Sequence, residues 1–329
     1  MFPDQQFVSP PSDLAPQLVV VVDTEEEFDW DAEPDPKARG VASMNAIGRV
    51  QRLFDEYGIV PCYVIDHPVA SQPEGIDALK PLLEAGRCEI GAHLHPWVNP
   101  PVREPITRSN MYPGNLPRDM EAEKLQCLRN TITENFGQSP VVYKAGRYGF
   151  GGNTAGILQE LGFTTDVSVC PPFDARGDGG PDYSRFDARP FWFGEGERLF
   201  ELPVTGGFVG WAHGLAPGLF NLAQGLRQFR APGILARLGA VDRLMLSPEG
   251  FTTREHIKLT RFLLNQGVRT FTWSFHSPSV VPGNTPYVRN EADLERFLER
   301  FRLYFDFFFN ELGGQASTPT RIKNLTESW

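Results

Sequence analysis

Short apolar runs alternate with amphipathic stretches along most of the chain. The first run is VVVV at residues 19–22, and four β-branched residues in a row suit a strand that is buried on both faces. Similar runs predict strands at residues 59–66, 88–93, 141–146, 163–169, 199–204, 242–246 and 268–275. Apolar residues at helical spacing predict helices at 43–57, 73–86, 120–137, 153–161, 217–238, 253–263 and 291–312.

This order of strands and helices is typical of an α/β protein with a parallel sheet. About seven βα units and no internal repeat fit either a parallel barrel or a doubly wound sheet, built as one domain. We expect residues 1–17 to form an irregular N-terminal arm, 18–313 the single β/α domain and 314–329 a mobile C-terminal tail.

Composition narrows the classes of partner. The chain carries 31 Lys and Arg against 41 Asp and Glu, a net charge of −10, which argues against nucleic acid. The first residues lack the features of a signal peptide, and no apolar run reaches the ~18 residues of a membrane span. These observations predict a cytoplasmic protein with no membrane span. The four cysteines have no CxxC spacing and are expected to be buried thiols.

Polar side chains stand at the ends of three predicted strands. Asp23 and Glu25 follow the first strand, His93 and His95 the third, and His276 the last. The carboxyl ends of parallel strands meet on one face, and residues two apart in an extended segment point the same way. Two histidines and a carboxylate are a known set of ligands for a catalytic divalent metal ion.

The acidic run after the first strand can also be read as a solvated turn. Charge runs usually face water, and only Asp23 and Glu25 share the spacing and the companions of site residues. The other carboxylates of this run are expected to form a solvated or loop-organising rim: Glu26, Glu27, Asp29 and Asp31.

Four motifs, in order, resemble those of the polysaccharide deacetylases with a NodB homology domain: VVVDTEEEF, EIGAHLHPW, YKAGRYGFGGN and FTWSFHSPS. The resemblance runs from about residue 18 to residue 312 and implies a distorted (β/α) barrel of about seven parallel strands. It further implies that Asp23 is the catalytic base, that Arg147 orients this base and that His276 protonates the leaving group. Glu25 and His93 would be metal ligands.

The second motif departs from the family pattern. The family has His-Ser/Thr-x-x-His, whereas Trp97 occupies the position of its second histidine in EIGAHLHPW. The second nitrogen ligand must then be His95, or else the metal site is altered or absent.

The resemblance implies a metal-dependent hydrolase that removes N- or O-acetyl groups from a carbohydrate. It would use one divalent ion, zinc first, with cobalt, nickel or manganese as alternatives. Trp97, Tyr148 and Trp273 are candidates to bind the substrate, with core packing as the alternative for Trp273. Two other functions stay open: hydrolysis of C–N bonds in small non-peptide amides on the same fold, with or without metal, and a catalytically silent carbohydrate-binding protein.

Overall fold

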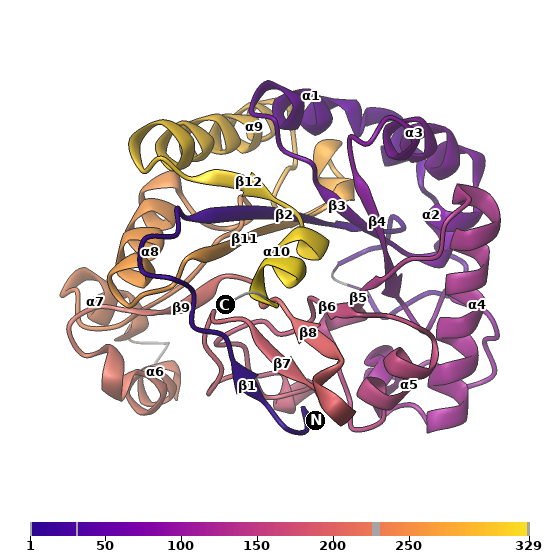
Figure 1. Ribbon diagram of the computed structural model, residues 1–329, viewed down its shortest axis with the longest axis horizontal. Helices are drawn as coiled ribbons and strands as arrows, with labels where there is room; N and C mark the ends of the chain where they lie inside the picture. The colour runs from indigo at the N-terminus through magenta and orange to yellow at the C-terminus, as the bar shows by residue number, and fades with distance from the viewer. Residues whose placement is uncertain (1, 31, 226–230, 328–329) are drawn as a thin grey trace.

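The computed structural model describes residues 2–30, 32–225 and 231–327, and its central feature is a curled sheet (Figure 1). In this part of the chain seven strands run parallel and lie side by side in the order β11-β2-β3-β4-β5-β6-β8. Their bounds are β2 Gln17–Thr24, β3 Cys62–Ile65, β4 Glu89–Leu94, β5 Val142–Ala145, β6 Thr165–Asp166, β8 Leu199–Glu201 and β11 Thr270–His276. The predicted parallel β/α architecture is confirmed.

Helices cover the outside of this sheet (Figure 1). They are α1 Gly48–Glu56, α2 His67–Ser71, α3 Pro73–Glu84, α4 Arg118–Phe136, α5 Thr154–Glu160, α8 Thr253–Asn265 and α9 Glu291–Phe305. Local signals fix several ends. Gly137 closes α4 in the left-handed region at φ 81°, and Thr252 with Glu255 forms a capping box at the start of α8. None of the described helices is long and apolar enough to cross a membrane.

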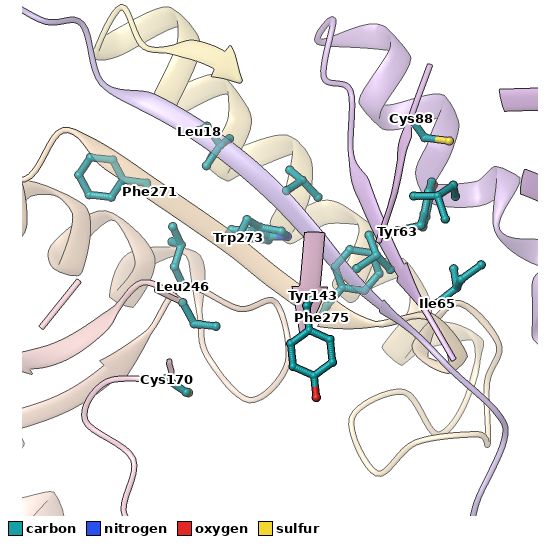
Figure 2. Packing of buried hydrophobic residues seen from close by; sticks show 14 of the residues in the cluster. Leu18, Tyr63, Ile65, Cys88, Tyr143, Cys170, Leu246, Phe271, Trp273 and Phe275 are labelled. Atoms are coloured by element: carbon teal, nitrogen blue, oxygen red, sulfur yellow. The ribbon is translucent and has the colours of Figure 1, made fainter. Parts of the chain in front are cut away.

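The main hydrophobic core lies between the sheet and these helices. The whole of β2 is buried, because its apolar run is covered on both faces. Trp273 and Phe275 of β11 point into this core (Figure 2), where Trp273 stacks on Tyr304 of α9 at a ring distance of 4.8 Å. Burial of such large aromatic side chains fixes the position of β11 against β2, and with it the strand ends that form the site.

An antiparallel hairpin interrupts the barrel between β8 and β11. It pairs β9 Gly206–Val209 with β10 Asp242–Met245, and helices α6 Ala216–Gly225 and α7 Ala231–Arg237 lie between these two strands in the sequence. A backbone hydrogen bond from Leu246 N to Thr205 O (2.8 Å) extends the pairing of the hairpin, and one from Ser274 N to Leu246 O (3.2 Å) connects the hairpin to β11. The barrel is therefore distorted.

Both ends of the chain add to the sheet. The N-terminal arm contains β1 Gln6–Phe7, which pairs with β7 Phe191–Phe193. The prediction of a mobile tail from residue 314 is wrong for residues 315–326. Strand β12 Gln315–Ser317 pairs with residues 17–19 of β2, and helix α10 Pro319–Thr326 buries Ile322 fully. The rest of the division into an arm and a single domain stays a prediction, and residues 328–329 lie outside the described part.

Candidate active site

A cleft of about 410 Å³ opens where the carboxyl ends of the parallel strands meet. Its lining includes most of the residues that the sequence singles out: Asp23, Glu25, His93, His95, Trp97, Arg147, Tyr148 and His276. The structure brings these side chains together from β2, β4, β5 and β11 and the turns that follow them. Trp273 is absent from the lining.

Glu25, His93 and His95 form a cluster of potential metal ligands. The Nε2 atoms of both histidines lie 3.5 Å from the same carboxylate oxygen, Oε2 of Glu25. The Nδ1 of His93 lies 3.1 Å from the carbonyl oxygen of Lys144, and the Nδ1 of His95 lies 2.8 Å from Oε2 of Glu26. Since each Nδ1 donates to an oxygen, the lone pairs of both imidazoles are on the Nε2 atoms that face Glu25.

The cluster fits a divalent cation. The second oxygen of Glu25, Oε1, is buried and has no hydrogen-bond partner among the described residues. Burial raises the pKa of Glu25 to about 7, because it outweighs the attraction of His276 and the hydrogen bond with His93. Burial also lowers the pKa of His95 to about 4 and that of His93 below its usual value. Two neutral imidazoles and one carboxylate are the donors that zinc and related ions take in catalytic sites.

Glu26 belongs to the site, and its prediction as part of a solvated rim is wrong. Its side chain is fully buried and accepts hydrogen bonds from His95 Nδ1 and from Trp97 Nε1, both at 2.8 Å. The chain leaves β2 at Thr24, so the two-residue alternation ends there and Glu26 turns inward beside Glu25. Glu27 keeps a loop-organising role through Ser43 N, and Asp31 lies outside the described residues.

Glu26 also forms a second acidic group with Asp66 and His95. Asp66 accepts hydrogen bonds from the backbone N–H groups of Glu26 and Val69, both at 2.8 Å, and it caps α2. Every carboxylate oxygen of this second group therefore has a hydrogen-bond donor. It is satisfied without an ion, and its effect on the site is to orient His95.

Asp23 is held by Lys144, and the predicted contact between Asp23 and Arg147 is wrong. Lys144 Nζ lies 2.6 and 2.8 Å from the two oxygens of Asp23 and 3.1 Å from Ser274 Oγ. Burial alone would raise the pKa of Asp23, but Lys144 and the histidines beside it outweigh burial, and the pKa is lowered. Asp23 is therefore a carboxylate at neutral pH.

Arg147 lies at the rim of the cleft. Its guanidinium pairs with Asp178 at 2.6 Å and lies over the ring of Tyr112. Lys144 belongs to the buried strand β5, whereas Arg147 follows that strand in a turn where its φ is 53° and that of Tyr148 is 60°. A lysine within an otherwise apolar strand needs a buried counter-charge. The lysine of the sequence YKAGR therefore indicates that Lys144 has a buried acidic partner.

His276 lies beside Asp23 and is paired with Glu249. The Nε2 of His276 lies 3.7 Å from Oδ2 of Asp23, and its Nδ1 lies 2.7 Å from Oε2 of Glu249. Burial would lower the pKa of His276, but the carboxylates of Glu249, Glu25 and Asp23 outweigh burial and raise the pKa to about 10. The imidazole is therefore protonated at neutral pH.

Glu249 comes from a loop that the sequence did not mark as functional. Ser279 Oγ donates to Glu249 Oε1 at 2.5 Å, so this carboxylate is fixed on both oxygens. The loop itself is held by His256 Nε2, which donates to Ser247 O at 2.7 Å, and by Arg300, which donates to Pro248 O. No motif surrounds Glu249, and only the fold brings it to His276.

Aromatic side chains form much of the remaining wall. Trp97 stacks on His95 at a ring distance of 4.3 Å, and its Nε1 donates a hydrogen bond to Glu26. The rings of Trp30 and His276 are nearly perpendicular, with their centroids 4.8 Å apart, and Tyr148 lies beside Lys144. Trp273 is fully buried in the core, so its prediction as a substrate-binding residue is wrong. Substrate binding by Trp97 and Tyr148 stays a prediction.

Solved structures show the same fold. A Mycobacterium smegmatis protein with the provisional name polysaccharide deacetylase superposes with a TM-score of 0.52 at 16% identity, covering 98% of this chain and 93% of that one. The 4-alpha-glucanotransferase from Thermococcus litoralis also gives a TM-score of 0.52, at 11% identity over 94% of this chain and 40% of its own. No family model and no curated protein matches.

These likenesses define the class of fold, a distorted β/α barrel that is shared with the provisionally named deacetylase. They do not define the reaction, because the two structures carry names of different activities at the same TM-score. The reaction has to be argued from the side chains in the cleft.

Proposed function

We propose that the protein is a metal-dependent hydrolase that removes N- or O-acetyl groups from a carbohydrate. The observation that carries this proposal is the arrangement of Glu25, His93 and His95, whose free ligand atoms face one another while each histidine Nδ1 is fixed by a separate acceptor. A divalent ion held there would polarise an acetyl carbonyl and lower the pKa of water.

The other side chains supply the proton transfers. Asp23, kept ionised by Lys144, takes a proton from the attacking water. His276, kept protonated by Glu249, gives a proton to the departing amine or alcohol. Asp23 and His276 end adjacent strands, and their side chains lie 3.7 Å apart in the free protein, so a base and an acid stand side by side within reach of one reacting carbonyl.

The lining of the cleft and the resemblance of the motifs support a carbohydrate as the substrate. Aromatic faces such as those of Trp30 and Tyr148 suit the C–H faces of sugar rings. A mixed lining, with charged groups at the strand ends and aromatic side chains along the walls, suits a ligand that is held by its ring and reacts at one polar group.

Metal analysis and acetate release test the proposal together. Purified protein should contain about one divalent ion per chain, and His93→Ala should lose it. Wild type should release acetate from acetylated oligosaccharides, whereas Asp23→Asn should not. Metal with no acetate release, but with release of ammonia or an amine from small amides, would favour amide hydrolysis instead. Binding of oligosaccharides with neither metal nor turnover would favour the silent binding protein.

A further inference from the structure

The segment between β8 and β10 differs in charge from the rest of the chain. Residues 202–241 contain no Asp or Glu, and they contain arginines at positions 227, 230 and 237. The chain as a whole has a net charge of −10. A basic stretch of this length without a single carboxylate is therefore a local feature against an acidic background.

The same segment carries the most exposed large hydrophobic side chains in the described part of the chain. Five large hydrophobic side chains there are more than half exposed: Trp211 78%, Leu215 71%, Leu222 67%, Ile234 52% and Leu238 68%. We call these five the α6–α7 face, after the helices that lie together at one end of the molecule (Figure 1). Elsewhere among the described residues no large hydrophobic exceeds the 47% of Leu303.

Helix α6 also has an inner face that packs against the rest of the protein. Ala216 and Ala223 of α6 are buried, and Phe220 packs on Phe208 of β9 at a ring distance of 5.2 Å. Leu215 and Leu222 are seven residues apart and so share a stripe on the other side of this helical segment. Since a helix with apolar residues on both sides is usually covered on both, the outer stripe needs an apolar surface to cover it.

We propose that the α6–α7 face docks on an anionic membrane surface. Leucine and isoleucine side chains would enter the boundary between headgroups and acyl chains, and Trp211 is the residue type that prefers this boundary. Arg237, in the last turn of α7, and the absence of any carboxylate from residues 202–241 match the negative potential of anionic lipids. Nucleic acid has the same sign of charge but offers no apolar layer to cover five exposed hydrophobic side chains.

Helix α6, which carries part of the docking face, also contacts the wall of the cleft. Arg243 of β10 lines the cleft, and its guanidinium lies 5.4 Å from the ring centroid of Phe220 in α6. No ion pair of Arg243 is found within the described residues. The inner face of α6 therefore contacts a residue of the cleft wall, while the outer stripe is free to meet the membrane, whatever reaction takes place in the cleft.

Vesicle sedimentation tests the proposal directly. Wild-type protein should bind vesicles of phosphatidylglycerol and phosphatidylcholine and should bind pure phosphatidylcholine much more weakly. The triple variant Leu215→Gln, Leu222→Gln, Leu238→Gln should lower the partition coefficient by about a thousandfold, because each leucine contributes roughly tenfold. Leu303→Gln, at an exposed leucine on α9, is the matched control and should bind as wild type does.

Trp211 provides a second measurement that does not depend on the triple variant folding normally. Vesicles with brominated acyl chains should quench part of the tryptophan fluorescence of wild type, and Trp211→Phe should lose this part. Absence of binding to anionic vesicles would overturn the proposal. So would a dimer in solution that the triple variant dissociates, since the face would then be covered by a second copy.

The outcome of the vesicle-binding test does not depend on whether the proposed reaction is correct. The triple variant should release acetate from a soluble acetylated oligosaccharide at the wild-type rate, because none of the three leucines lines the cleft. Loss of vesicle binding with turnover unchanged supports the docking face alone, and vesicle binding by a protein without turnover supports it equally.

Discussion

Two histidines of the cleft make the same contact and have opposite pKa shifts. His95 Nδ1 lies 2.8 Å from Glu26, and His276 Nδ1 lies 2.7 Å from Glu249. The pKa of His95 is lowered to about 4, whereas that of His276 is raised to about 10. A histidine–glutamate pair therefore does not by itself decide whether the imidazole carries a charge.

The surroundings of each pair account for the difference. The side chain of His95 is 3% exposed, and its glutamate is so buried that the pKa of Glu26 is itself raised. The side chain of His276 is 20% exposed and faces Asp23 and Glu25 as well as Glu249. Burial dominates at the first pair and the surrounding negative charge dominates at the second. The first histidine can bind a metal ion, and the second can donate a proton.

The largest expected effect comes from removing each imidazole in turn. His95→Ala should abolish stoichiometric metal binding and reduce acetate release to background, because one ligand of the site is lost. His276→Ala should keep the metal and lower kcat by about 10²–10⁴, the range for loss of a general acid. Metal content by mass spectrometry and turnover on the same samples measure both. Loss of metal in His276→Ala would contradict the assignment of His95 as a metal ligand and of His276 as a proton donor.

Lys144 supplies the positive charge on the Asp23 side of the cleft. Lys144→Met should destabilise the fold by about 3–5 kcal/mol, because it leaves the buried carboxylate of Asp23 without a partner. Arg147→Met is the matched control and should cost less than about 1 kcal/mol, since the pair between Arg147 and Asp178 is exposed to solvent. Urea unfolding measures both. Equal losses would contradict the assignment of Lys144, and not Arg147, to Asp23.

The strand ends of the site could be predicted from the sequence because they depend on short-range patterns. The apolar run at 19–22 marks the strand that carries Asp23 and Glu25, and the HLH spacing places two imidazoles on one side of β4. Each of these residues lies within two positions of a strand that apolar periodicity identifies. Their convergence then follows from the parallel sheet.

The partners of these residues could not be predicted in the same way. Glu249 is separated from His276 by α8 and most of β11, and no local pattern distinguishes it from other loop carboxylates. The sequence predicts Glu26 on the rim of the site. Its turn inward depends on where β2 ends, which the apolar pattern does not define. The motif predicts that Arg147 contacts Asp23, whereas the buried positive charge on β5 belongs to Lys144. Sequence periodicity predicts which residues lie near the site, and tertiary packing decides which of them are paired.

Glu249 can be tested through the pH profile. The pKa of His276 in the folded protein is raised above its ordinary value of 6.5, so protonation stabilises the fold fully below 6.5, and this contribution is lost as the pH rises towards 10. Turnover that needs the protonated imidazole should fall on the alkaline side near the same pKa. In Glu249→Gln this alkaline limb should move towards neutral pH, because one of the carboxylates that raise the pKa is gone. An unchanged limb would assign it to another group.

The smallest expected effect is at Glu26, which acts on the metal site only through His95. In Glu26→Gln the amide oxygen can still accept from His95 Nδ1, but the amide N–H₂ then faces the N–H of Trp97 where the carboxylate accepted. Metal affinity should fall by about 10–100-fold, the range for loss of a group that orients a metal-binding histidine. Competition with a chelator measures the affinity. Glu27→Gln is the matched control, because Glu27 accepts from Ser43 N in the loop and has no contact with either histidine among the described hydrogen bonds. If metal affinity fell equally in both variants, the acidic run would act by its charge alone. Glu26 would then not act on one histidine in the way that Glu249 acts on His276.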